Sequence, residues 1–137
     1  MRLKPLIAKQ YMMKGCEKSR DKVYSTNTMA IEKSLVSGSM TMLILKLLSE
    51  KDMYGYEMID TLRQKSQNVF ELKAGTLYPL LHSLEDKGFL TVYEQEAAGK
   101  TRKYYSLTRQ GRGFLEKKVE EWKEYSAAVT NVIVMEV

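Results

Sequence analysis

Leucines near the middle of the chain recur at the spacing of an α-helix. In residues 75–90, GTLYPLLHSLEDKGFL, four of them fall at i, i+3, i+4 and i+7, which lines one helix face and requires a core to cover it. Gly88 follows the last of them, where a left-handed glycine commonly ends a helix. We place the helix start at residues 74–76, because Pro79 is tolerated only near the backbone donors that lack partners. The leucines are Leu77, Leu80, Leu81 and Leu84, and the face expected to point outward carries Tyr78, Pro79, His82 and Asp86.

Two more helices are predicted upstream of this central helix. Residues 40–48, MTMLILKLL, are apolar almost all round, so this helix must be covered both by its own core and by something else, such as a second subunit. Residues 54–65 form the second helix, and its inward face consists of Gly55, Met58, Ile59 and Leu62. In the connection at residues 67–73, Phe70 and Leu72 alternate with polar neighbours, as in a short strand or a hydrophobic plug.

A hairpin and a long final helix are predicted downstream. Residues 89–95 and 102–107 are rich in aromatic and β-branched side chains and flank a small turn at residues 97–99. Thr108 is a natural N-cap for a helix that continues to about residue 132. This order predicts a mostly helical α+β fold, a winged helix-turn-helix, which is a DNA-binding architecture. We divide the chain into residues 1–28, a basic arm, residues 29–107, the DNA-binding domain, and residues 108–137, the dimerisation helix.

Apolar residues of the last helix form a heptad-like seam. They step by 4, 3, 4, 3 and 4 positions along a helix that is too long to lie wholly on so small a core. Such a seam requires another helix, and the same helix of a second copy would supply it in a two-fold homodimer. The seam consists of Leu115, Val119, Trp122, Ser126, Val129 and Ile133.

The net charge of +5 arises entirely from the arm. Residues 1–28 contain seven Lys and Arg against two Asp and Glu, whereas residues 29–137 contain fifteen of each. Bulk charge is therefore no evidence that the folded part binds DNA. The arm is either a functional segment that adds phosphate contacts or an upstream extension from a misplaced start codon before Met29.

The composition argues against a metal site, a membrane-spanning helix and an internal disulfide. Cys16 is the only cysteine and His82 the only histidine, which excludes an internal disulfide and a zinc or iron cluster within one chain. No run approaches 18 apolar residues, so we expect no membrane span. We expect a cytoplasmic protein without a cofactor. Because there is also no glycine-rich phosphate loop and no credible Ser, His and Asp set, we expect no enzyme.

Three motifs in the right order resemble one family. The stretch GTLYPLLHSLEDKGFL, followed by GKTRKYYSLTRQGR, is similar to the recognition helix, wing and following helix start of the PadR-like family of bacterial transcriptional repressors. YGYEMIDTL, upstream, resembles the second helix of that family, and the likeness covers about residues 35–125. Within that family, the chain resembles the small PadR-like proteins, the subfamily with a short C-terminal helix. The resemblance implies a winged-helix regulator that binds double-stranded DNA.

The central helix carries the first candidate DNA contacts. In a helix-turn-helix, the outward N-terminal half of this helix enters the major groove, which makes Lys73, Thr76, Tyr78 and His82 candidates. The resemblance implies that Thr76 and Tyr78 contact phosphates or bases and that Tyr54 approaches the DNA backbone. The structural alternative is that Thr76 caps the helix, Tyr78 packs on its neighbours and His82 is a solvated surface residue.

The hairpin tip carries the second set of candidates. Lys100, Arg102 and Lys103 lie within four residues beside the turn, where a basic ribbon can follow phosphates or enter the minor groove. The alternative is an ordinary solvated charged face. We expect a Lys103 substitution to weaken binding to all DNA sequences equally.

Trp122 is the only tryptophan and lies in the middle of the seam. Its simplest role is an aromatic anchor of the dimer interface. The resemblance implies a second role, since some small PadR-like regulators stack flat aromatic drugs between paired tryptophans of this helix. The sequence as a whole predicts a homodimeric repressor that binds an inverted-repeat operator and is released by a small aromatic effector. The alternative is a winged-helix protein-interaction module without specific DNA binding.

Overall fold

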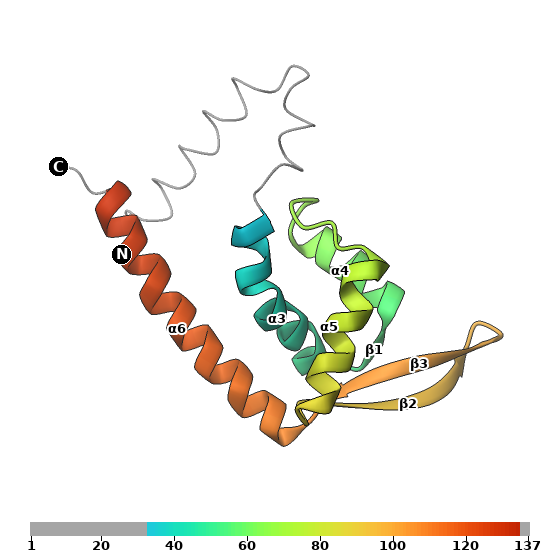
Figure 1. The fold of residues 1–137 in the computed structure, drawn as a ribbon. Coiled ribbons are helices and arrows are strands. Elements are labelled where there is room, and N and C mark those ends of the chain that lie inside the picture. The colour runs from blue at the N-terminus through green and yellow to red at the C-terminus, as the bar shows by residue number, and fades with distance from the viewer. Residues whose placement is uncertain (1–32, 135–137) are drawn as a thin grey trace, which may run out of the picture.

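The computed structural model describes residues 33–134, and the predicted arm at residues 1–28 lies outside them (Figure 1). The elements in chain order are α3 (Lys33–Glu50), β1 (Met53–Tyr54), α4 (Gly55–Lys65), α5 (Ala74–Asp86), β2 (Leu90–Ala97), β3 (Lys100–Leu107) and α6 (Arg109–Ile133).

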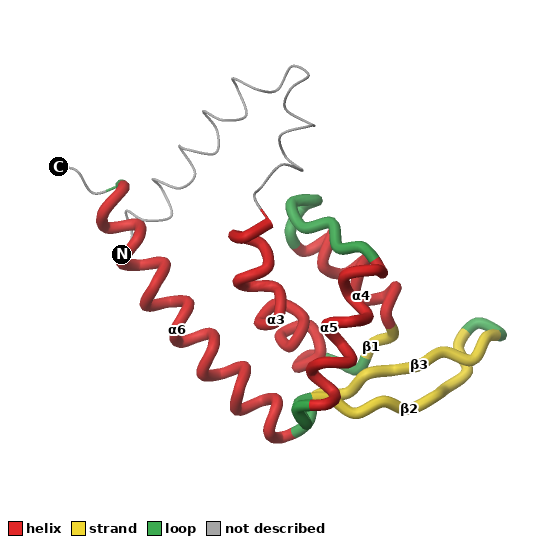
Figure 2. Tube along the Cα trace, viewed as in Figure 1, coloured by secondary structure: helices red, strands yellow, loops and turns green. Residues whose placement is uncertain are grey.

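Helices α3, α4 and α5 form a body from which two long elements project. The β2–β3 hairpin extends from one end of this body, and α6 runs beside α3 and continues past it (Figures 1 and 2). The core lies between the three helices, the inner face of the sheet and the start of α6. This arrangement confirms the predicted mostly helical α+β fold. The largest fully buried side chains are Ile44, Leu45, Met58, Leu77, Leu81, Leu84 and Leu90.

The leucine stripe of α5 faces the core as predicted. Leu77, Leu81 and Leu84 are buried, and Leu80 is half-buried against them. The helix begins at Ala74, within the expected range. All apolar side chains of residues 40–48 are likewise buried or half-buried within this one chain, so α3 needs less external cover than its composition indicates.

Pro79 lies near the start of α5, as predicted. It is the sixth residue of the helix, beyond the four N–H groups that have no intrahelical partner. It therefore lies close to those free donors, as expected, but not among them, and the Gly75 carbonyl loses its helical hydrogen bond. Because both residues are exposed, water can replace the missing donor.

The end of α5 and the start of α6 are tied together by hydrogen bonds. Gly88 has a positive φ of 84°, as predicted for a helix-ending glycine, and the Phe89 N–H donates to the Leu84 carbonyl at 3.0 Å. The Thr108 hydroxyl donates to the Gly88 carbonyl at 2.8 Å and accepts from the Gly111 N–H at 2.9 Å. This confirms Thr108 as the N-cap of α6 and fixes the angle at which α6 leaves the body.

The sheet contains one more strand than the sequence predicts. Its order is β1-β3-β2, all antiparallel, and β2 pairs with β3 from Leu90 opposite Leu107 to Ala97 opposite Lys100. The turn is a two-residue one, Ala98-Gly99, with positive φ at both residues. The additional strand is β1, which pairs with β3 directly before α4, where we predicted no strand. Two residues are too few to show strand alternation, so only the pairing defines β1.

The connection between α4 and α5, predicted to be either a short strand or a hydrophobic plug, is a hydrophobic plug. Leu72 is buried and Phe70 packs against the core, but no strand forms there.

Leu115, which we assigned to the dimer seam, is also a core residue, with only 6% of its surface exposed in the single chain. The first turns of α6 already lie against the body, so little of the Leu115 side chain is left for a second copy.

Candidate nucleic-acid interface

The outward side of α5 carries three of the predicted DNA contacts. Lys73 precedes the helix in an extended conformation, and its side chain makes no capping hydrogen bond. The Thr76 N–H donates to the Lys73 carbonyl at 2.9 Å, whereas the Thr76 hydroxyl has no partner within residues 33–134. Thr76 is therefore not the cap of α5. Lys73, Thr76 and His82 are all exposed, and the first turn of α5 contains no acidic residue that would repel a phosphate.

Tyr78 does not point fully outward as expected. Its ring is half-buried and packs against the core. Gly55, at the start of α4, makes room for it, since a Cβ atom on Gly55 would lie 2.6 Å from Tyr78 Cζ. Burial raises the pKa of the Tyr78 hydroxyl above its ordinary value of 10.0, so the hydroxyl is a hydrogen-bond donor at neutral pH. The packing alternative is thus correct for the ring, and only the hydroxyl end is left for a ligand.

Two of the three wing cations are exposed, and the third is held by the sheet. Lys100 begins β3 beside the tip, and Lys103 lies three residues further along. The Arg102 guanidinium lies over the Tyr54 ring, with its central carbon 4.3 Å from the ring centroid. Such a cation–π contact restricts the guanidinium and holds it against the start of α4.

A row of tyrosines crosses the outer face of the sheet, and sequence reasoning missed it. Tyr104 on β3 lies between Tyr54 on β1 and Tyr93 on β2, with ring centroids 5.4 and 5.7 Å apart. The Tyr93 hydroxyl donates to Asp52 Oδ2 at 2.7 Å, and this bond raises the pKa of the Tyr93 hydroxyl. The alternation of residues 102 and 104 in β3 indicates that they share a face, but finding their partners requires knowing that β1 exists.

The fold brings half of the predicted DNA contacts to one place. A groove of about 250 Å³ lies where the start of α4, the middle of α5 and β3 meet. The lining consists of Tyr54, Gly55, Tyr56, Tyr78, Arg102 and Lys103. The predicted contacts outside this lining are Lys73, Thr76, His82 and Lys100.

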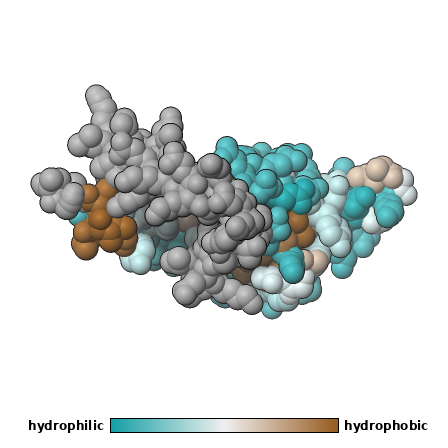
Figure 3. Space-filling view, turned by 90° about the horizontal axis from the view of Figure 1, so that it is seen from above, coloured by the Kyte–Doolittle hydropathy of each residue, from teal (hydrophilic) through white to brown (hydrophobic). Residues whose placement is uncertain are grey.

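The second half of α6 carries large hydrophobic side chains that are uncovered. Val119 packs against the core, but Trp122 is 50% exposed and Val132 is 82% exposed. Seen from above, hydrophobic residues gather where α6 ends (Figure 3). The exposed large hydrophobic residues of α6 are Trp122, Tyr125, Val129, Val132 and Ile133.

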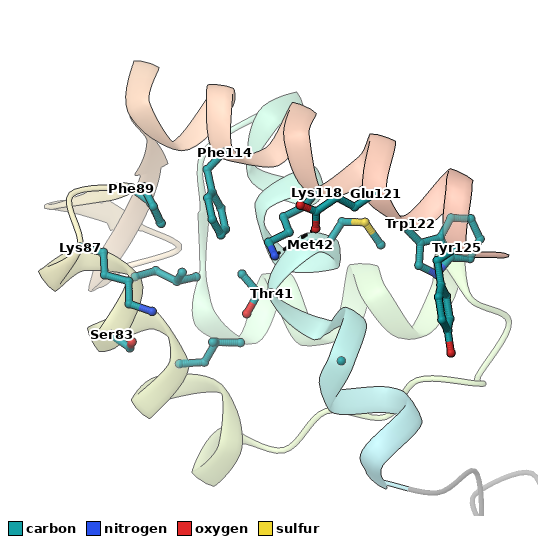
Figure 4. A pocket seen from close by; sticks show the side chains of 13 residues that line it. Thr41, Met42, Ser83, Lys87, Phe89, Phe114, Lys118, Glu121, Trp122 and Tyr125 are labelled. Carbon is teal, nitrogen blue, oxygen red and sulfur yellow. Dashed lines mark hydrogen bonds and ion pairs between the residues drawn. The ribbon is translucent and has the colours of Figure 1, made fainter. Parts of the chain in front are cut away.

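A cleft of about 580 Å³ separates this part of α6 from α3 and the end of α5. Phe89 and Phe114 stack at one side, with ring centroids 4.4 Å apart, while Trp122 and Tyr125 lie at the other (Figure 4). The Lys118 ammonium above the cleft pairs with Glu121 at 3.3 Å. The lining of the cleft thus combines aromatic rings with three charged side chains, Lys87, Lys118 and Glu121.

Within residues 33–134, no cluster of three or more His, Cys, Asp or Glu side chains could hold a metal ion. No helix in that range is long and apolar enough to cross a membrane.

The three-helix body, the projecting hairpin and the outward, acid-free start of α5 together define a winged helix-turn-helix protein. The chain matches the model of the transcriptional regulator PadR-like family over residues 44–117, more than half its length. It belongs to the PadR-like family of transcriptional regulators.

Individual relatives agree with this assignment. The transcriptional regulator YqjI of Escherichia coli is 32% identical over 84 residues, which are 61% of this chain but only 39% of that protein. A transcriptional regulator of Clostridium thermocellum is 35% identical and superposes with a TM-score of 0.68, covering 76% of this chain and 98% of its own. A PadR-like regulator of Bacillus cereus is 27% identical, with a TM-score of 0.69 over 76% of this chain and all of its own.

Family membership settles several expectations. It confirms the resemblance read from the three motifs, the winged helix-turn-helix fold, and a role in transcription regulation through DNA rather than in catalysis. The family match ends at residue 117, so it covers the wing and the buried start of α6 but not the exposed apolar half of that helix.

Proposed function

We propose that this protein is a homodimeric repressor that binds an inverted-repeat operator. The observation that carries the proposal is the separation of two surfaces: polar and cationic groups on α5 and the wing, and uncovered apolar groups on the second half of α6. The first surface fits DNA, and the second fits another copy of the chain. In such a dimer the two α5 helices enter successive major grooves about 34 Å apart.

The apolar half of α6 supports the dimer because exposed aromatic and aliphatic residues on one helix require cover. Analytical ultracentrifugation of the full chain tests this directly. We expect Val132→Glu to shift the protein to monomer, because it places a charge in the interface, while Asn131→Glu, at an exposed polar neighbour, leaves the dimer intact. A wild-type chain that sediments as a monomer at micromolar concentration overturns this part.

DNA binding is tested with the chain's own upstream DNA by fluorescence anisotropy and footprinting. We expect Thr76→Ala to lower affinity for the operator by about tenfold, or about 1.4 kcal/mol. Thr91→Ala is the matched control, because Thr91 is exposed on β2 and lies outside the predicted contacts. Footprints on two half-sites about one helical turn apart are expected, and a single unrepeated site would contradict the operator type.

Lys103 provides a test of the wing. As a phosphate contact, it should affect every DNA sequence equally and contribute about one to the slope of log affinity against log salt. We expect Lys103→Gln to reduce that slope by about one and to leave sequence preference unchanged. Loss confined to one base position would assign Lys103 to base reading instead.

The cleft beside Trp122 supports release by a small aromatic effector. Its volume lies in the range of small-molecule sites, and its rings come from α6 and from Phe89, in the segment between α5 and β2. A ligand there would change the angle between the two wings of a dimer, because it binds one spacing better than another. Trp122 is the only tryptophan, so its fluorescence reports occupancy directly. We expect saturable quenching by planar cationic dyes, and its absence would end the effector proposal.

The alternative function is a protein-interaction module without specific DNA binding. The cationic wing and the acid-free start of α5 argue against it. It would be favoured by a chain that forms the dimer but gives no footprint.

Residues 1–28, proposed as an arm that adds phosphate contacts, are tested by deleting them, and an unchanged salt slope removes the arm from the mechanism.

A further inference from the structure

The cleft between α3 and α6 leaves two large aromatic side chains exposed. Trp122 and Tyr125 each have half or more of their surface exposed, and both lie at one side of the cleft (Figure 4). Met42, Leu80 and Phe114 add apolar surface to the lining. Because the removal of apolar surface from water is favourable, a segment with apolar side chains would be stabilised by covering this cleft.

The start of α3 lies beside the cleft. Gly38, which belongs to the lining, is only five residues after Lys33, where α3 begins, or about 7.5 Å along the helix. Gly38 is exposed, and a Cβ atom added to it would meet none of the described residues within 4 Å. Residues 1–32, which lie outside the described part of the chain, are therefore attached at the edge of the cleft. Such a tether makes even a weak contact an intramolecular one.

The first fourteen residues of the arm have a composition that suits the cleft. The segment MRLKPLIAKQYMMK contains four Lys and Arg and no Asp or Glu. Its apolar side chains include Leu3, Leu6, Ile7 and Tyr11. A segment of this kind can cover aromatic rings and also meet acidic side chains.

The second half of α6 has the opposite charge. Residues 119–134 contain three Glu and one Lys. Within the described residues, Glu124 forms no ion pair, whereas Glu120 pairs with Lys123 at 3.8 Å and Glu121 with Lys118 at 3.3 Å. The arm and this half of α6 are therefore complementary in charge as well as in apolar surface.

The two lysines of the cleft do not oppose a basic segment at its tryptophan side. The Lys118 ammonium is already paired with Glu121, and Lys87 lies near Phe89, at the side away from Trp122 (Figure 4). The favourable place for the arm is therefore the part of the cleft beside Trp122.

The length of the chain permits this contact. Leu6 lies 27 residues before Lys33, and an extended chain spans about 3.3 Å per residue, so the connection can reach roughly 90 Å. Helix α6, with 25 residues, is only about 38 Å long. The apolar part of the arm can therefore reach the whole of α6 in its own chain.

We propose that residues 3–13 bind in the cleft of their own chain, where their apolar side chains pack against Trp122 and Tyr125. Lys4 and Lys9 then lie near the Glu residues of α6. The end of α6 from residue 129 onward lies outside the lining of the cleft and is left for a second copy.

The contact would also regulate the cleft. An aromatic effector would have to displace the arm before it could stack on Trp122, so the arm is a competitor built into the chain. This part of the inference rests on the proposed effector site, whereas the binding of the arm to the cleft does not.

The first experiment uses the full chain, which contains one cysteine and one tryptophan. A dansyl group on Cys16 accepts excitation energy from Trp122, so the transfer reports whether the arm lies near the cleft. We expect the double variant Leu6→Ser, Ile7→Ser to lose transfer and to shift Trp122 emission to longer wavelength, because water reaches the ring. The matched control is the double variant Val23→Ser, Tyr24→Ser, which should behave as the wild type.

Circular dichroism confirms that each variant is folded. If the Leu6 and Ile7 variant has the same transfer and the same Trp122 emission as the wild type, the arm does not bind in the cleft.

The same measurement in Val132→Glu, the variant designed to be monomeric, identifies the chain to which the arm binds. Because the proposed contact is intramolecular, energy transfer should persist in this variant and should not change on dilution. Transfer that disappears when the dimer dissociates would place the arm on the second copy and overturn the assignment to its own chain.

The second experiment tests the competition. Planar cationic dyes are titrated into the unlabelled wild type and both double variants, and quenching of Trp122 fluorescence gives the affinity. We expect the Leu6 and Ile7 variant to bind dye about tenfold more tightly, because a closed state no longer reduces the fraction of open clefts. The Val23 and Tyr24 variant should match the wild type. Equal dye affinity in all three proteins overturns the competition.

The outcomes separate this inference from the proposed function. If energy transfer depends on Leu6 and Ile7 but no dye quenches Trp122, the arm binds in the cleft, and the effector proposal falls together with the competition. If dye quenches Trp122 but energy transfer and emission are the same in every variant, the effector proposal stands and the arm is not in the cleft.

Discussion

The two halves of α6 share one spacing of apolar residues but have opposite surroundings. In the first half, Leu115 is buried and Phe114 stacks on Phe89. In the second half, Trp122 and Val132 are half or more exposed. The heptad-like pattern thus reports which side of the helix is apolar, but not what covers that side. The body of the same chain covers it as far as Val119, and we propose that a second copy covers the rest.

The largest expected effect comes from the buried half. Leu115→Ala removes a core side chain and leaves a cavity, so the free energy of unfolding should fall by about 2–5 kcal/mol. Urea denaturation monitored by circular dichroism measures this. Val132→Ala is the matched control in the exposed half, and at protein concentrations low enough to dissociate a dimer it should change stability by less than about 0.5 kcal/mol. Equal losses for the two variants would contradict the division of α6.

Two glycines of α6 give the next test. A Cβ atom on Gly111 would lie 2.7 Å from Leu107 Cδ1 and would also meet the Phe89 carbonyl oxygen. Gly111→Ala should therefore destabilise the protein by about 1–3 kcal/mol through overpacking.

Gly113, two residues on, has open space around it. Gly113→Ala should stabilise the protein by about 0.5–1 kcal/mol, because alanine favours a helix interior. Thermal unfolding of the two variants in parallel distinguishes the effect of steric contact at Gly111 from the effect of helix propensity at Gly113. Stabilisation by Gly111→Ala would show that the start of α6 does not pack tightly against Phe89 and Leu107.

The cap of α6 gives a smaller effect. Thr108→Ala removes the acceptor for the Gly111 N–H and the donor to the Gly88 carbonyl, and should reduce the free energy of unfolding by about 0.5–2 kcal/mol. Thr108→Ser keeps the hydroxyl and should restore most of the loss. If the serine variant is as unstable as the alanine variant, the methyl group rather than the cap is responsible.

The smallest effect on folding is expected at the end of α6. Val132→Glu replaces a side chain that is 82% exposed, so the stability of the single chain should change by less than about 0.5 kcal/mol. The same change should abolish the proposed dimer. Sedimentation measures whether the variant still forms the dimer, and denaturation measures whether its folding stability has changed. A variant that unfolds would place Val132 in the core.

The sequence predicted elements whose pattern is local. The leucine stripe of α5, the stop at Gly88 and the cap at Thr108 each depend on residues within a turn or two, and all three are found. The family motifs were recognisable for the same reason, because GTLYP and KYYSLT are contiguous.

Features that depend on distant segments were missed or misassigned. β1 exists only through its pairing with β3, some fifty residues away. A helical wheel places Tyr78 on the outward face of α5. Its ring nevertheless packs against the core, because Gly55 has no side chain that would occupy the same space. Leu115 fits the seam by spacing, and only the packing of α6 on the body identifies it as core. The groove was not predicted as one site, because its residues come from four elements, β1, α4, α5 and β3.

The two residues of β1 have a consequence for chimeric regulators. Because β3 pairs on one edge with Tyr54 and Tyr93 is anchored by Asp52, the wing is fastened to the junction of α3 and α4 as well as to its own base. A hairpin transplanted alone from a relative would lack the pairing with β1 and the hydrogen bond to Asp52 that hold it in place. Exchanging operator preference between such proteins therefore requires moving residues 52–54 together with residues 90–107.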